Sequence, residues 1–90
     1  MTADPERLGA RILDLAAARG PDKSICPSEV ARDLAGSNEK EWRLLMKPIR
    51  QAAVRLALER RVELRRKGRA VDPEDFRGIY RITITQEEPS

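Results

Sequence analysis

The hydrophobic pattern of this chain changes its period once, immediately after Arg61. Up to that residue, apolar side chains recur every three or four positions, as on one face of a helix. After it they alternate with polar ones, as in a half-buried strand. The chain is therefore expected to fold as helices followed by strands. Its 90 residues suit a single domain over 1–90, with an ordered core at about 5–85 and a polar tail at 86–90.

Two helices have clear boundaries in the sequence. Asp4 precedes a proline and supplies a side-chain acceptor for a helix start, and Gly20 ends the apolar repeat that follows, so the first helix is predicted over 5–19. A second helix of about eight residues is predicted to begin at Pro27 and to stop before Gly36.

The third helical pattern, over 39–61, contains Pro48. Proline lacks an amide donor, and its ring clashes with the carbonyl four residues earlier, which here belongs to Leu44. We therefore expect a short segment at 41–46 and then a main helix at about 47–60. This division places Pro48 in a first turn, where proline is tolerated.

Two antiparallel strands are predicted after the helices. Val62 and Leu64 alternate with charged residues, and a second alternating run is centred on Ile82. Between the runs, 66–74 contains basic, glycine and proline positions. This connection is too long for a tight hairpin and predicts a protruding loop. A short apolar segment around Ile25, between the first two helices, is a further strand candidate.

The expected order of elements is that of a winged helix-turn-helix domain: helix, short strand, two helices, strand, basic loop and strand. The predicted fold class is therefore mainly α (α+β): three helices that share one core, with a small antiparallel β-hairpin as the wing. In that architecture the last helix presents a polar face to the major groove of DNA, and the wing loop reaches neighbouring phosphates.

The positive charge of the chain is concentrated in the third helix and the region that follows it. Between Arg43 and Arg69 there are ten Lys or Arg residues and two Glu, a net charge of +8, whereas the whole chain carries +3. The remaining residues therefore sum to −5. A charge division of this kind is typical of a surface that faces nucleic acid, and duplex DNA is the expected partner.

The candidate DNA contacts fall into a helix set and a wing set. On the helix, Arg50 and Gln51 suit the base edges of guanine and adenine, whereas Arg43 and Lys47 suit phosphates. The helix set is Arg43, Lys47, Arg50, Gln51 and Arg55. The wing set, expected to contact phosphates, is Arg65, Arg66, Lys67 and Arg69. The same charges also suit a solvated face that binds an acidic protein, or an edge strand protected from aggregation by its charge, and both alternatives stay open.

Val54 and Leu58 are apolar residues that fall within the basic face on a helical wheel. Either the helix rotates after Pro48 and places Leu58 under the wing strands, or the two residues form a homodimer seam. We favour the rotation and hence a monomer, because full burial of a leucine stabilises a small domain by about 1.5–3 kcal/mol.

Composition disfavours several functional classes. The chain has no histidine and one cysteine, Cys26, so it lacks the commonest general base and the commonest zinc ligand. We expect it not to be an enzyme and to need no metal or cofactor. Its three aromatic residues are few for stacking single-stranded nucleic acid. A lone cysteine fits a reducing compartment, and no apolar run approaches the roughly 18 residues of a membrane span. A cytoplasmic location without membrane attachment is therefore expected.

Three segments of the chain resemble a known bacterial family. They are Ile25 to Arg32 (ICPSEVAR), Trp42 with Met46, Arg50 and Ala53, and Gly68 to Pro73 (GRAVDP) followed by the pair Arg77-Gly78. From about Leu8 to Ile84 the chain is similar to the domain of unknown function 3253 family, which is related to winged-helix domains. The resemblance implies the winged-helix architecture and no mechanism.

The expected function is therefore a duplex DNA-binding module, in transcription regulation or as a nucleoid accessory. This expectation rests on the order of elements together with the placement of charge. The alternative is a winged-helix protein-protein interaction module whose basic face binds an acidic partner.

Overall fold

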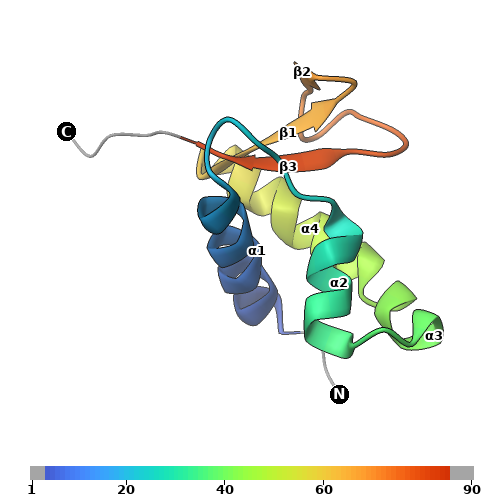
Figure 1. The fold of residues 1–90 in the computed structure, drawn as a ribbon. Coiled ribbons are helices and arrows are strands. Elements are labelled where there is room, and N and C mark those ends of the chain that lie inside the picture. Colours follow the sequence, from blue (N-terminus) through green and yellow to red (C-terminus); the bar gives the residue numbers. More distant parts are fainter. Residues whose placement is uncertain (1–3, 86–90) are drawn as a thin grey trace.

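The computed structural model describes residues 4–85, which form four helices and a three-stranded antiparallel sheet (Figure 1). The elements are α1 (Pro5–Arg19), α2 (Pro27–Ala35), α3 (Glu39–Arg43), α4 (Met46–Leu58), β1 (Val62–Arg66), β2 (Arg69–Ala70) and β3 (Arg81–Ile84). An isolated bridge between Ile25 and Ile82 supplies the short strand expected between the first two helices. The predicted α+β class and the winged-helix-like order are confirmed. The tail predicted at 86–90 lies outside the described residues.

Side-chain caps set the starts of the first two helices at the predicted positions. The Asp4 carboxylate accepts a hydrogen bond from the Glu6 amide at 3.0 Å. Ahead of α2, the Glu29 carboxylate accepts the Cys26 amide at 3.3 Å. Each carboxylate thus satisfies an amide at a helix start that has no partner within the helix.

The third helical pattern is divided earlier than predicted. α3 and α4 meet at Leu44–Leu45, so the expected division between 46 and 47 is corrected. Leu44 is the residue whose carbonyl the ring of Pro48 would meet in a continuous helix, and the chain leaves the helix at that point. α4 also stops short of the predicted end at 60. It ends at Leu58, because Arg60 adopts the left-handed conformation with a φ of 62°.

The connection between the two predicted strands is long, as expected, but it begins with a tight hairpin that was not predicted from the sequence. β1 and β2 pair antiparallel with Arg66 opposite Arg69, so only Lys67 and Gly68 form the turn. Both turn residues have positive φ, 51° and 79°, the combination of a type I′ turn, whose twist matches that of a hairpin. The prediction failed because lysine is not a usual residue for this conformation, so the Lys-Gly pair gave no hairpin signal.

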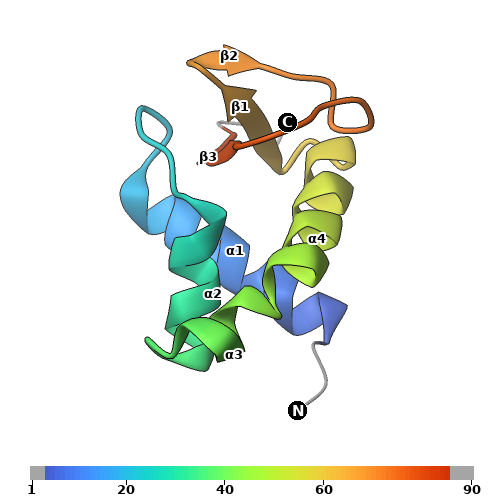
Figure 2. The same cartoon turned by 90° about the vertical axis from the view of Figure 1, so that its right-hand side faces the viewer.

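Residues 71–80, the return segment, lead from β2 back to β3. Figure 2 shows this segment curling beside the C-terminal end of α4. Its Phe76 and Tyr80 are buried, and their rings meet edge to face with centroids 5.2 Å apart. β3 then pairs with β1, with Ile82 opposite Leu64. Through Phe76 and Tyr80, the return segment that connects β1–β2 to β3 thus contributes to the core.

The core lies between the helices and one face of the sheet (Figure 1). Every layer contributes a fully buried side chain, and the largest are Ile12, Ile25, Val30, Ile49, Leu64 and Ile82. This shared core fixes α4 against both α1 and β1.

Leu58 does not lie under the wing strands as expected. Its exposed fraction is 51%, whereas Val54 is half-buried and packs against the core. The buried face of α4 carries Ala53 and Leu56, and Leu58 belongs to the opposite side of the helix. The expected burial of Leu58 is therefore corrected, and it no longer argues for a monomer.

Ile82→Ala is expected to lower the free energy of unfolding by about 2–5 kcal/mol, because it leaves a cavity at a fully buried position. Ile79→Ala is the matched control, since Ile79 in the return segment is 83% exposed and its truncation should cost less than about 0.5 kcal/mol. Urea unfolding of both variants measures the difference, and equal losses would contradict the assigned core.

Candidate nucleic-acid interface

The outward face of α4 carries three exposed polar side chains, Lys47, Gln51 and Arg55. They lie opposite the buried Ile49 and Ala53, as their spacing along the helix requires. Within residues 4–85, Lys47 and Gln51 have no side-chain hydrogen-bond or ion-pair partner. Both side chains are therefore available to a ligand.

Arg43 and Arg55 are exposed but have neighbours. Nε of Arg43 lies 3.9 Å from the carboxylate of Glu39, one turn earlier. Nη2 of Arg55 donates to the Pro5 carbonyl of α1 at 3.4 Å. Long, exposed contacts of this kind contribute little to stability, so either arginine can exchange its partner for a phosphate.

Arg50 is directed into the fold and does not share the exposed face of Gln51. Its Nη2 donates a hydrogen bond of 2.8 Å to the carbonyl of Phe76. The guanidinium carbon lies 4.0 Å from the Phe76 ring centroid and 5.9 Å from that of Tyr80. Arg50 therefore connects α4 to the return segment, although the sequence predicted a base-reading position for it.

Sequence reasoning missed Phe76 and Tyr80 as the partners of Arg50. The composition contained a signal, since two of the three aromatic residues in the chain lie in the return segment. A nearby arginine is attracted to the face of an aromatic ring. The helical wheel could not use this signal, because the partners lie more than 20 residues away in sequence.

Arg66, on β1, contacts the end of the return segment that leads into β3. Its Nε donates to the Ile79 carbonyl at 3.0 Å. Its guanidinium lies so close to Gly78 that a Cβ atom there would come within 2.9 Å of Nη2. Gly78 also has a φ of 85°. The guanidinium could shift to admit a Cβ atom, whereas the positive φ favours glycine, which accounts for the glycine of the Arg77-Gly78 pair.

The remaining wing arginines and lysine divide into paired and free side chains. Arg65 is half-buried and bonds to Glu63 two residues earlier on β1. Lys67 and Arg69 are exposed at the tip of the hairpin, and they have no side-chain partner in the described part of the chain. Two of the four predicted wing residues are thus free to bind a ligand.

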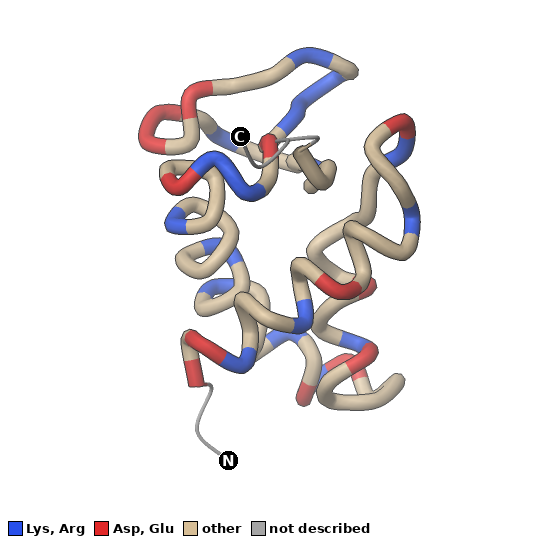
Figure 3. The backbone as a smooth tube through the Cα atoms, turned by 90° about the vertical axis from the view of Figure 1, so that its left-hand side faces the viewer, with Lys and Arg blue, Asp and Glu red and all other residues tan. Residues whose placement is uncertain are grey.

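Figure 3 shows how charge is distributed around this region. Lys and Arg residues follow α4 and the β1–β2 hairpin, as the sequence indicates. The return segment carries Asp72, Glu74 and Asp75 and curls beside the C-terminal end of α4 (Figure 2). The Asp72 carboxylate accepts the Glu74 amide at 2.9 Å. The basic residues of α4 therefore have an acidic segment as a neighbour at that end of the helix.

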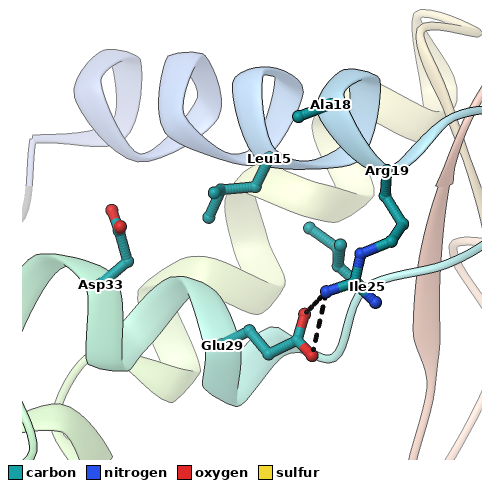
Figure 4. A pocket seen from close by; sticks show the side chains of 6 residues that line it. All are labelled: Leu15, Ala18, Arg19, Ile25, Glu29 and Asp33. Atoms are coloured by element: carbon teal, nitrogen blue, oxygen red, sulfur yellow. Dashed lines mark hydrogen bonds and ion pairs between the residues drawn. The ribbon is translucent and has the colours of Figure 1, made fainter.

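A hollow lies between α1 and α2 (Figure 4). Leu15 and Ile25 line it, and an ion pair of 3.3 Å between Arg19 and Glu29 crosses its mouth. Asp33 at its other end is bonded to Arg11, which lowers the pKa of this carboxyl group. Its charged groups are thus already paired within the protein.

The acidic side chains and the helix lengths bear on two further classes of site. Among residues 4–85, no group of three or more Cys, Asp or Glu side chains is placed to hold a metal ion. None of the helices in that range is both long and apolar enough to cross a membrane.

The fold and this surface define a small winged-helix-like α+β domain with a basic helix and a basic hairpin. Residues 5–85, nearly the whole chain, match the family described as "Protein of unknown function (DUF3253)". The chain belongs to this family. A search of curated proteins found no match.

Arg50→Met is expected to lower the free energy of unfolding by about 1.5–3 kcal/mol, because methionine keeps an apolar stem but loses the bond to the Phe76 carbonyl. Arg43→Met removes an exposed arginine with one weak ion pair and should cost less than about 0.5 kcal/mol. Urea midpoints compare the two variants. Similar small losses in both would mean that Arg50 does not hold the return segment.

Tyr80→Phe tests the buried hydroxyl of Tyr80, which has no hydrogen-bond partner among the described residues. Burial raises the pKa of Tyr80 from 10.0 to about 12. In the wild type, the unfolded state therefore ionises first, and the free energy of unfolding should fall between pH 10 and about 12. Phenylalanine should remove this part of the pH dependence and cost little stability at pH 7. A loss of stability at pH 7 on this substitution would indicate a partner for the hydroxyl.

Proposed function

We propose that this protein is a duplex DNA-binding module of the winged helix-turn-helix kind. It inserts the outward face of α4 into the major groove and sets the β1–β2 hairpin on neighbouring phosphates. The observation that carries the proposal is that two elements of one domain present exposed polar side chains. These are Lys47 and Gln51 on α4, and Lys67 and Arg69 at the hairpin tip. All four side chains lack an internal partner among the described residues.

The contacts divide into three roles. Gln51 reads a base edge, with adenine as the base its amide suits best. Lys47, Lys67 and Arg69 bind phosphates, and so do Arg43 and Arg55 once they release their weak internal partners. The internally bonded arginines, which are Arg50, Arg65 and Arg66, support this surface from inside the protein.

The cellular role that fits such a module is transcription regulation or nucleoid accessory binding in a bacterial cytoplasm. About five cationic contacts on a small domain favour modest affinity that depends strongly on salt. An interaction module for an acidic protein is the second candidate, and exposed Ile79 beside the wing favours it.

Titration of a labelled random duplex of about 20 base pairs at several salt concentrations tests the proposal. Contacts with about four to six phosphates predict that log affinity falls with log salt at a slope of about −4 to −5. Absence of binding even at low salt would exclude DNA binding through this face. Salt-dependent capture of an acidic polypeptide in place of duplex would favour the second candidate.

Two variants assign the contacts in the same titration. Lys67→Asn removes the charge and keeps the turn, since asparagine tolerates the left-handed conformation, and it should reduce the salt slope by about 1 on any duplex. Gln51→Ala should cost about 1–3 kcal/mol on a preferred site obtained by selection and little on random DNA. Lys23→Gln, at an exposed lysine between α1 and α2, is the control that should leave both unchanged.

A further inference from the structure

The described residues contain three large apolar side chains that are well exposed, Leu44 (76%), Leu58 (51%) and Ile79 (83%). Leu44 lies at the junction of α3 and α4, Leu58 ends α4, and Ile79 lies in the return segment. All three are thus in the half of the chain that carries the basic surface. Single exposed apolar residues are normal on a protein surface, so what distinguishes these three is their position on the basic side of the domain.

Leu44 lies on the same side of the helix as Gln51. The backbone at Leu44 and Leu45 stays in the right-handed region, with φ and ψ of −64° and −21° and of −86° and −12°. The break before α4 therefore preserves the approximate helical turn. Seven residues, about two turns, separate Leu44 from Gln51, and Lys47 lies between them on that side.

Leu58 also lies seven residues from Gln51, so the two leucines are distinguished by their surroundings. Leu44 is flanked by Arg43 and Lys47, both exposed, and Lys47 has no internal partner among the described residues. Leu58 is followed by Glu59, which is paired with Arg61 at 4.0 Å, and the return segment curls beside that end of α4 (Figure 2). The unpaired charge of Lys47 attracts groove phosphates to the first position.

We propose that Leu44 is a specificity-determining residue that packs against the C5-methyl group of thymine in the major groove. This inference rests on the proposed function and names its preferred substrate as duplex DNA containing A·T pairs. The thymine methyl group packs against apolar side chains, and adenine forms a pair of hydrogen bonds with a side-chain amide such as that of Gln51. Leu44 and Gln51, two turns apart on one face, therefore recognise the two chemical features that distinguish A·T pairs.

A comparison of thymine and deoxyuridine duplexes tests the contact directly. The two bases have the same hydrogen-bonding groups and differ only in the methyl group. The wild-type protein should bind an A·T-rich thymine duplex more tightly than its deoxyuridine version, by about fourfold for each methyl group covered. Leu44→Ala should bring this ratio close to 1 with the salt slope unchanged, and Leu44→Met should restore most of it.

Leu58→Ala is the matched control and should keep the wild-type ratio. Because the ratio is compared between variants, any difference in duplex flexibility cancels. Two results would overturn this inference and leave the proposed function standing. The first is salt-dependent binding in which the wild type has equal affinity for both duplexes. The second is a thymine preference that is lost in Leu58→Ala and kept in Leu44→Ala.

Absence of binding to either duplex would overturn the proposed function itself. A wild-type dimer in sedimentation that Leu44→Ala converts to a monomer, without discrimination of the methyl group, would overturn the inference and assign Leu44 to a second copy of the chain.

Discussion

The hydrogen bond between the Arg50 guanidinium and the Phe76 carbonyl joins α4 to the return segment. The same guanidinium covers the Phe76 ring, so a single side chain supplies a charge-assisted hydrogen bond and a cation-π contact. Arg66 binds the Ile79 carbonyl three residues further on. Together the two arginines hold the return segment from α4 and from β1, while the shared core fixes β1 itself against α4.

This arrangement changes what the charge of the segment means. The sequence places ten cations between Arg43 and Arg69. Arg50 and Arg66 keep their charge but commit donors to carbonyls of the return segment, whereas Arg43, Arg61 and Arg65 are paired with carboxylates. The return segment, which curls beside the C-terminal end of α4, also carries three carboxylates. A linear count of charge therefore overstates the free positive surface. Within this stretch, the cations without a side-chain partner among the described residues are Lys47 on α4, Arg60 just after it, and Lys67 and Arg69 at the hairpin tip.

The bounds of the first two helices, a break close to Pro48 and the order of elements could be predicted from the sequence, because their causes are local. Asp4, Glu29 and Pro48 act on amides and carbonyls within four residues of themselves, so the pattern contains the information. The hairpin and the direction of Arg50 could not be predicted in this way. Lys67 adopts a left-handed conformation that its residue type does not favour, and Arg50 finds partners that only the tertiary fold brings near. The helical wheel placed Leu58 on the outward face, where it lies. Its predicted burial is wrong because the helix does not rotate after Pro48 as assumed, since Leu44 and Leu45 stay in the right-handed region. Membership of a family of unknown function supports no particular activity.

The central claim is that one surface, made of the outward face of α4 and the hairpin tip, binds duplex DNA. Amide chemical shifts of the labelled protein, followed during titration with a random duplex at low salt, test it most directly. We expect the largest shifts at Lys47, Gln51 and the Lys67-Gly68 turn, with Arg19 and Glu29 in the α1–α2 hollow unchanged. Shifts confined to that hollow, or none at saturating duplex, would contradict the claim.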